Sequence, residues 1–281
     1  MFAWVVPDRP VQLGPDAQTY LLAAGGEPVV RPFHLRWFLP WLCGRDAETW
    51  WLVWWLSWPV AAIGFAMWRF YAGDPVELIV AGVVVLLALP GVVGPQVTIP
   101  VGVDLPAMAV TLVGVGCLQA GVWPAALACF VVAASMKETM PVWAALWMWS
   151  PVPLLALLAP AVRYVLVKPA AVSQVGAEMT FVAQHPIRSA WLAHRGRWRD
   201  GWLMVAPWGV GVLALVSVDW RLAVLLVVAY AQLLVATDTV RLVQVAAGPA
   251  VAVAAVQVIP VEWMVLVLVA HVVWSRQMER V

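Results

Sequence analysis

The sequence predicts an all-α membrane protein, a polytopic bundle of about nine transmembrane helices with an amphipathic juxtamembrane segment before the first span. Hydrophobic residues make up 64% of the 281 residues, charged residues only 11%, and the mean hydropathy is +0.90. A soluble domain of this size could not bury so much apolar surface. The chain also contains 20 tryptophans, and many lie near the ends of the expected spans, as the membrane interface favours. We therefore expect a multi-pass protein of a bacterial-type plasma membrane, in contact with membrane lipids.

Composition also excludes several classes of function. A net charge of +1 provides no basic field that could gather nucleic acid phosphates. The three cysteines are odd in number and lack metal-ligand spacing, so neither a disulfide framework nor a zinc site is expected. His185, His194 and His271 show no ligand spacing either, and each is expected to be structural. No metal ligands are assigned.

Two regions follow from the distribution of polar residues. Residues 1–48 form an expected extracytoplasmic juxtamembrane segment, and residues 49–281 form the transmembrane helical domain. The juxtamembrane segment contains an amphipathic helix, Ala17–Ala24, which a Gly-Gly pair ends. The first span, Thr49–Tyr71, is long enough to cross roughly 30 Å of hydrocarbon at about 1.5 Å per residue.

Eight further apolar stretches complete the predicted bundle. Two of them are marginal for a full crossing and form a short or partly re-entrant pair, 107–120 and 122–136. A Pro-rich link that contains Asp104, Pro95–Pro106, precedes this pair, and Pro151 and Pro153 are expected to kink the span that follows it. The eight stretches are Glu77–Val93, Ala107–Ala120, Val122–Met136, Val142–Val167, Gly201–Val218, Leu222–Ala236, a run that ends at Ile259, and Val261–Trp274.

A basic polar loop at about 168–200 sets the expected topology. Arginine and lysine outnumber acidic residues in it, so the positive-inside tendency places it in the cytoplasm. Counting crossings from this loop puts the juxtamembrane segment outside and the C-terminus inside. The same count puts Lys137 and Glu138 on the outer side, with Asp16.

Asp16 is the first candidate for chemistry, because each charge kept in an apolar scaffold is costly. A carboxylate at the membrane surface could accept a proton from a substrate hydroxyl. It could equally cap the helix 17–24, since Pro15 precedes it and aspartate is a favoured cap. The two roles are compatible.

Two further groups are candidates for binding an anion. Arg31, His34 and Arg36 lie in a short Pro-flanked segment that returns toward the membrane, where a guanidinium could bind a phosphate or a lipid headgroup. Arginines that merely extend to lipid headgroups would give the same pattern. Lys137 and Glu138 could hold an anionic donor and orient an acceptor, or form an ordinary loop pair.

A late polar pair, Asp238 and Arg241, has i,i+3 spacing at an expected helix start. This spacing first suggests a helix cap or a local ion pair. Crossing parity places both residues on the cytoplasmic side if 222–236 spans fully. A re-entrant neighbouring segment would bring them to the side of Asp16.

Four short motifs in order resemble integral-membrane glycosyltransferases of the GT-C superfamily, which use sugars carried on polyprenyl phosphate. They are Asp16 followed by Tyr20, then RPFHLRWFLPWL from Arg31, KET from Lys137, and TDTVRLVQVAAGP from Thr237. Members usually have a transmembrane helix before the acidic loop, whereas only 1–6 form an apolar run here.

The resemblance implies a function and a role for each candidate residue. A sugar would move from a polyprenyl-phosphate donor to an acceptor hydroxyl on the extracytoplasmic side, with inversion and with Asp16 as the base. Neither the sugar, the acceptor nor a requirement for a divalent metal follows from these motifs. The donor phosphate would be bound by Arg31, Arg36, Lys137 and Arg241, and the substrates by Tyr20, His34, Glu138 and Asp238.

A non-catalytic membrane transporter or a lipid flippase is the alternative, because it would also keep membrane arginines and scattered carboxylates. Such proteins commonly contain an inverted repeat with matching broken helices in two halves. We find no such repeat in the sequence.

Overall fold

The structure is a computed structural model of the chain. Among the described residues all regular structure is helical, which confirms the predicted fold class at the level of an all-α protein. The described residues are 15–29, 33–89, 92, 102–169, 185, 187–189, 191–192, 208, 219–234 and 240–263.

The described part of the predicted juxtamembrane segment contains three short helices before α3 (Ala47–Tyr71): α1 (Pro15–Ala24), η2 (Phe33–Leu35) and α2 (Phe38–Cys43). One face of α1 buries Ala17 and Tyr20, and the helix gives way to a turn in which Gly26 has a φ of +78°. Because α1 begins at Pro15, residue 16 occupies the second helical position instead of the expected cap. Proline suits the first position because the N–H that it lacks would have no helical partner there.

The long helix α3 (Ala47–Tyr71) contains the first predicted span. Asp46 caps it, since its side chain accepts hydrogen bonds from the backbone N–H of Glu48 and Thr49 at 3.3 and 3.0 Å. Within the described ranges, α3 is the one helix that is long and apolar enough to cross a membrane. The predicted nine-span count therefore stays a prediction. Six shorter apolar helices cover Val76–Ala88, Asp104–Gln119, Trp123–Met136, Val152–Leu166, Trp220–Leu234 and Val243–Val258.

The predicted marginal pair of spans is a helical hairpin, α6 (Asp104–Gln119) and α7 (Trp123–Met136). Gly121, at a φ of +79°, lies in the turn between them. The expected link through residue 106 ends earlier, because α6 already begins at Asp104. Pro106 fits there since the first-turn N–H groups have no intrahelical acceptor, and an acidic first residue suits the helix dipole.

The predicted kinked span 142–167 is divided into three helices, α8 (Met140–Met148), η3 (Val152–Leu157) and α9 (Leu158–Leu166). Trp149 has a left-handed φ of 49°, which ends α8 before the two prolines. The break is therefore larger than the predicted kink.

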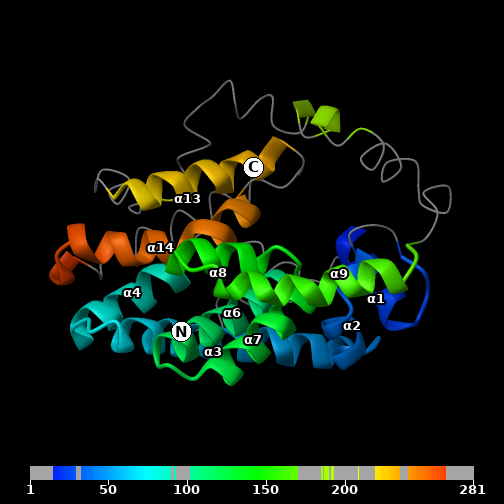
Figure 1. The fold of residues 1–281 in the computed structure, drawn as a ribbon, viewed down its shortest axis with the longest axis horizontal. Helices are drawn as coiled ribbons and strands as arrows, with labels where there is room; N and C mark the ends of the chain where they lie inside the picture. Colours follow the sequence, from blue (N-terminus) through cyan, green and yellow to red (C-terminus); the bar gives the residue numbers. More distant parts are fainter. Residues whose placement is uncertain are drawn as a thin grey trace.

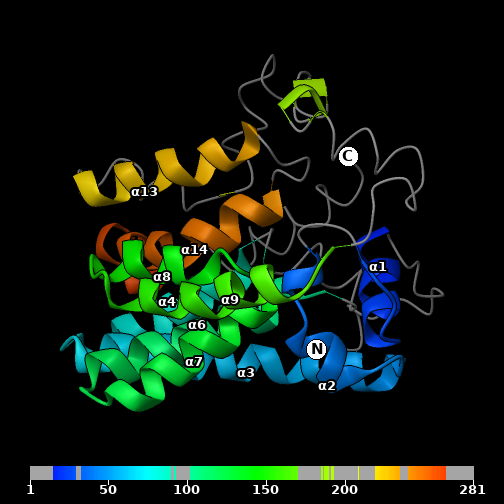
Figure 2. The same cartoon turned by 45° about the vertical axis from the view of Figure 1, so that its right-hand side comes forward.

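The remaining described helices are α4 (Val76–Ala88), α13 (Trp220–Ala231), η6 (Gln232–Leu234), α14 (Val240–Val258) and η7 (Val261–Trp263). Helix α4 packs against both α3 and α14 (Figures 1 and 2). Helix α14 lies between α4 and α13. The Nε1 of Trp147, in α8, donates a hydrogen bond at 2.7 Å to the carbonyl of Ala246, in α14. Helices α1 and α2 lie together at one end of the molecule, beside the start of α3.

Glycine permits a close crossing of α3 and α6. A Cβ added at Gly64 would lie 2.5 Å from the backbone nitrogen of Val113, and one added at Gly116 would lie 2.7 Å from the Cβ of Met67. Small residues allow helix backbones to approach closely in membrane proteins. The crossing therefore depends on the absence of a side chain at both positions.

We expect Gly64→Val to destabilise the protein by about 1–3 kcal/mol, because backbone atoms of α6 cannot move aside as a flexible side chain would. Thermal unfolding in detergent measures the effect. The matched control is Ala128→Val, at an exposed position of α7, which should change the midpoint little. Equal midpoints for the two variants would contradict the proposed close crossing.

Candidate functional site

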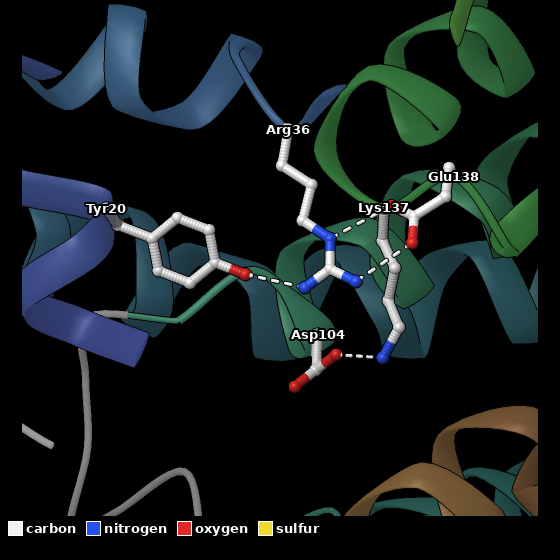
Figure 3. Close-up of polar contacts among 5 residues, drawn as sticks. All are labelled: Tyr20, Arg36, Asp104, Lys137 and Glu138. Atoms are coloured by element: carbon white, nitrogen blue, oxygen red, sulfur yellow. Dashed lines mark hydrogen bonds and ion pairs between the residues drawn. The ribbon is translucent and has the colours of Figure 1, made fainter. Parts of the chain in front are cut away.

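Five polar side chains from four separate parts of the chain meet at one place, and we call them the polar cluster (Figure 3). Tyr20 comes from α1, Arg36 from the segment between η2 and α2, Asp104 from the start of α6, and Lys137 and Glu138 from the turn between α7 and α8. The hairpin of α6 and α7 brings residue 137 back to residue 104. The cluster thus joins the juxtamembrane segment to the helical bundle.

Arg36 is the centre of the polar cluster. Its Nε and Nη2 donate to the two carboxylate oxygens of Glu138, each at 2.9 Å, and its Nη1 donates to the Tyr20 hydroxyl at 3.0 Å. The side chains of Arg36 and Glu138 are 15% and 22% exposed. A bidentate pair fixes the plane of the guanidinium as well as its position. These contacts use three of the five guanidinium N–H groups.

The opposite charges of Arg36 and Glu138 stabilise each other. Burial on its own would raise the pKa of Glu138, but the adjacent Arg36 guanidinium, with a smaller contribution from Lys137, holds that pKa below its usual value. Burial would lower the pKa of Arg36, and Tyr20 and Glu138 more than offset this, so its pKa lies well above the usual value. Both groups are therefore charged at neutral pH.

Lys137 and Asp104 form a second ion pair, through the lysine Nζ and a carboxylate oxygen. Both residues are buried, with 4% and 5% of their surface exposed. Lys137 directly follows the C-terminus of α7 and Asp104 begins α6, so each charge also suits the dipole of its helix. Two cations and two carboxylates give the polar cluster a formal charge of zero.

Aromatic side chains support the cluster on the juxtamembrane side. The ring of Tyr20 contacts Phe33 edge to face at a centroid distance of 5.2 Å and Trp50 at 6.2 Å. The carbonyl of His34 accepts a hydrogen bond from Arg163 Nε of α9 at 2.8 Å. The imidazole of His34 is buried 6.1 Å from the ring of Tyr164. The short η2 helix is therefore held between α1 and α9.

The structure brings together four of the residues predicted for the site: Tyr20, Arg36, Lys137 and Glu138. It adds Asp104, which we did not predict as a site residue. A buried lysine needs a carboxylate partner, and that requirement is the signal that could have indicated an acidic residue in the preceding link.

His34, also predicted for the site, is not one of the five side chains of the polar cluster, and its buried imidazole lies beside the ring of Tyr164. The remaining predicted residues are described only in part or not at all. Arg31 and Asp238 lie outside the described residues. Positions 16 and 241 are described by their backbone alone, in the first turns of α1 and α14, and residue 16 lies one turn before Tyr20. The roles predicted for all of these residues stay predictions. Within the described residues no group of three or more His, Cys, Asp or Glu is arranged to hold a metal ion.

Comparison with known proteins found no matching family, no similar curated protein and no similar solved structure. Function is therefore inferred from the chemistry and position of the site residues.

Proposed function

We propose that this protein is a multi-pass membrane glycosyltransferase of the GT-C type. It would move a sugar from a polyprenyl-phosphate donor to an acceptor hydroxyl on the extracytoplasmic side, with Asp16 as the base. The observation that supports this best is the polar cluster, which attaches the segment that carries Asp16 to the turn that carries Lys137 and Glu138.

The distribution of apolar side chains supports a membrane location. In the most apolar 18-residue window of α3, 33% of the residues are buried inside the protein, which suits a lipid-facing helix better than the core helix of a soluble protein. Exposed apolar surface of this extent is what lipid would cover. Large exposed hydrophobic residues on four helices include Leu52, Leu56, Ile63, Val80, Leu158, Val162, Val165 and Val227.

The α6 and α7 hairpin would occupy only part of a bilayer. Its helices of 16 and 14 residues extend about 24 and 21 Å at about 1.5 Å per residue, which is less than the roughly 30 Å of a typical hydrocarbon core. A hairpin of this length fits a locally thinned bilayer or a partly re-entrant insertion. Either arrangement would hold Asp104 and Lys137 close to the membrane surface.

In the proposed reaction the acceptor oxygen attacks the anomeric carbon of the donor sugar while Asp16 takes the hydroxyl proton. The bond between the anomeric carbon and the phosphate oxygen breaks, and polyprenyl phosphate leaves with the electron pair. Attack opposite the leaving group inverts the configuration. Because the leaving group is already a stabilised anion, positioning and charge stabilisation matter more than acid catalysis.

The polar cluster is suited to hold that anion without repelling it. Two N–H groups of Arg36 and two of Lys137 remain beyond the contacts described above, since an ammonium has three donors and a guanidinium five. The carboxylates of Asp104 and Glu138 keep both cations in place, and the formal charge of zero adds no repulsion toward a phosphate. Further donor contacts by Arg31 and Arg241, and substrate contacts by His34 and Asp238, follow the family resemblance.

Binding of the lipid carrier tests this role of the polar cluster. A short-chain polyprenyl phosphate should raise the unfolding temperature of the purified protein in detergent, because a ligand that binds the folded state stabilises it. The corresponding polyprenyl alcohol lacks the phosphate and should raise it much less. The double variant Asp104→Asn with Lys137→Gln removes a cation without leaving a buried charge unpaired, and it should lose most of the phosphate-specific shift.

Two outcomes would count against this role. Equal stabilisation by the alcohol and the phosphate would show that only the apolar tail is bound. A full phosphate-specific shift in the double variant would place the phosphate away from Lys137.

A further inference from the structure

We infer that the contacts from Glu138 through Arg36 to Tyr20 form an anchor that positions α1, and with it residue 16, on the helical bundle. Tyr20 is then a positioning residue and not the substrate ligand that the resemblance implies. The anchor itself consists of contacts among described residues, and its catalytic consequence rests on the proposed function.

Helix α1 needs such an anchor because it is short. It has ten residues, and isolated helices of fewer than about 12 residues are marginal in water. Its buried side chains include Ala17 and Tyr20, and the partners of the tyrosine ring, Phe33 and Trp50, lie outside α1. Tertiary contacts of this kind must therefore hold the helix in place.

The contacts of the anchor fix the position of α1 relative to the helical bundle. Glu138 binds Arg36 through both oxygens, which fixes the plane of the guanidinium and therefore the direction of Nη1. This nitrogen donates to the Tyr20 hydroxyl at 3.0 Å, as Figure 3 shows. Arg36 and Glu138 are 102 residues apart in the sequence, so the contact joins the juxtamembrane segment to the turn between α7 and α8.

Position 16 depends on this anchor through the helix itself. Residues 16 and 20 are both within α1, and a spacing of four residues corresponds to about 6 Å along a helix at about 1.5 Å per residue. Residues at i and i+4 share one helix face. A shift or rotation of α1 would therefore move the proposed base relative to Lys137 and Glu138.

Tyr20→Phe removes only the hydroxyl and tests the anchor without disturbing the Arg36 and Glu138 pair. Hydrogen–deuterium exchange should become faster in the amides of α1 and stay unchanged in α6. In the transfer assay kcat should fall roughly 10- to 100-fold, as misplacement of a catalytic group by about 1 Å can cause. The KM values for donor and acceptor should stay within about twofold, because a positioning residue touches neither substrate. Tyr71→Phe, at an exposed tyrosine in the last turn of α3, is the matched control.

The outcomes separate failure of the anchor from failure of the proposed function. If the wild-type protein transfers no sugar, the glycosyltransferase proposal fails, and hydrogen exchange in α1 decides the anchor alone. Unchanged exchange in α1 of Tyr20→Phe would overturn the anchor. A raised KM with unchanged kcat would also overturn it, because that result identifies Tyr20 as a substrate ligand.

Discussion

Replacement of Asp16 by asparagine is expected to abolish sugar transfer while the protein stays folded. Asparagine has nearly the same size as aspartate and is tolerated in the first turn of a helix, but it cannot accept a proton as a base. Loss of a general base typically costs 10²–10⁴-fold in rate, so turnover should fall by about that factor. Transfer of a labelled sugar measures the effect, and thermal unfolding measures the stability of the same sample.

Asp46→Asn is the matched control for this experiment. Asp46 caps α3 in the same juxtamembrane segment, and asparagine caps helices about as well as aspartate, so activity and stability should both be kept. Wild-type turnover of Asp16→Asn would remove Asp16 as the base. A loss of stability without any change in the turnover of the folded fraction would identify Asp16 as a residue that only stabilises the helix.

Glu138→Gln is expected to be strongly destabilising, because Glu138 pairs with the Arg36 guanidinium through both of its carboxylate oxygens. It leaves the Arg36 guanidinium inside the protein without its carboxylate, and breaking a buried ion pair costs about 3–5 kcal/mol. The cost should lie near the lower value, because 22% of the Glu138 side chain is exposed. Chemical or thermal unfolding in detergent measures the change. Glu27→Gln, in the exposed pair with Arg45, should have little effect.

Removal of both charges should restore part of the stability. In the double variant Arg36→Gln with Glu138→Gln no unpaired charge stays buried, so its loss should be smaller than the sum of the two single losses. Additive losses would show that the pair is not coupled.

The same pair predicts a dependence of stability on pH. The pKa of Glu138 is lower in the folded protein than its ordinary value. The stabilising contribution of the Glu138 carboxylate to the free energy of unfolding is therefore complete at pH values above the unfolded pKa of about 4.3. The contribution is lost as the pH falls from there through the folded pKa. The difference in stability between wild type and Glu138→Gln should therefore shrink in acid, and a constant difference from pH 7 to 3 would contradict the pair.

The sequence predicted the positions of the helices more accurately than the contacts between the site residues. The apolar runs predicted α3, α6 and α7 closely because burial and helix length leave few alternatives. The predicted start of α6 is wrong by three residues, because Pro106 does not end a link but occupies the first turn of the helix. The break at Trp149 had no local signal beyond the prolines that follow it.

The cost of charge in an apolar chain pointed to Arg36, Lys137 and Glu138, and the resemblance added Tyr20. The structure brings these four side chains together, and their roles stay predictions. Which of them pair could not be predicted, because the partners lie far apart in the sequence. Lys137 and Asp104 are 33 residues apart and are brought together by the hairpin turn at Gly121. The pairing therefore depends on the tertiary packing of α6 and α7, which no local pattern encodes.

The proposed sugar transfer from a polyprenyl-phosphate donor is tested by an assay of the purified wild-type protein. The protein, in detergent or in lipid vesicles, would be incubated with a panel of labelled polyprenyl-phosphate monosaccharides and a panel of hydroxyl acceptors. We predict one donor that yields a glycosylated product with inverted anomeric configuration and free polyprenyl phosphate in equal amount. Absence of transfer from every donor, by protein that is folded and binds polyprenyl phosphate, would contradict the proposed function.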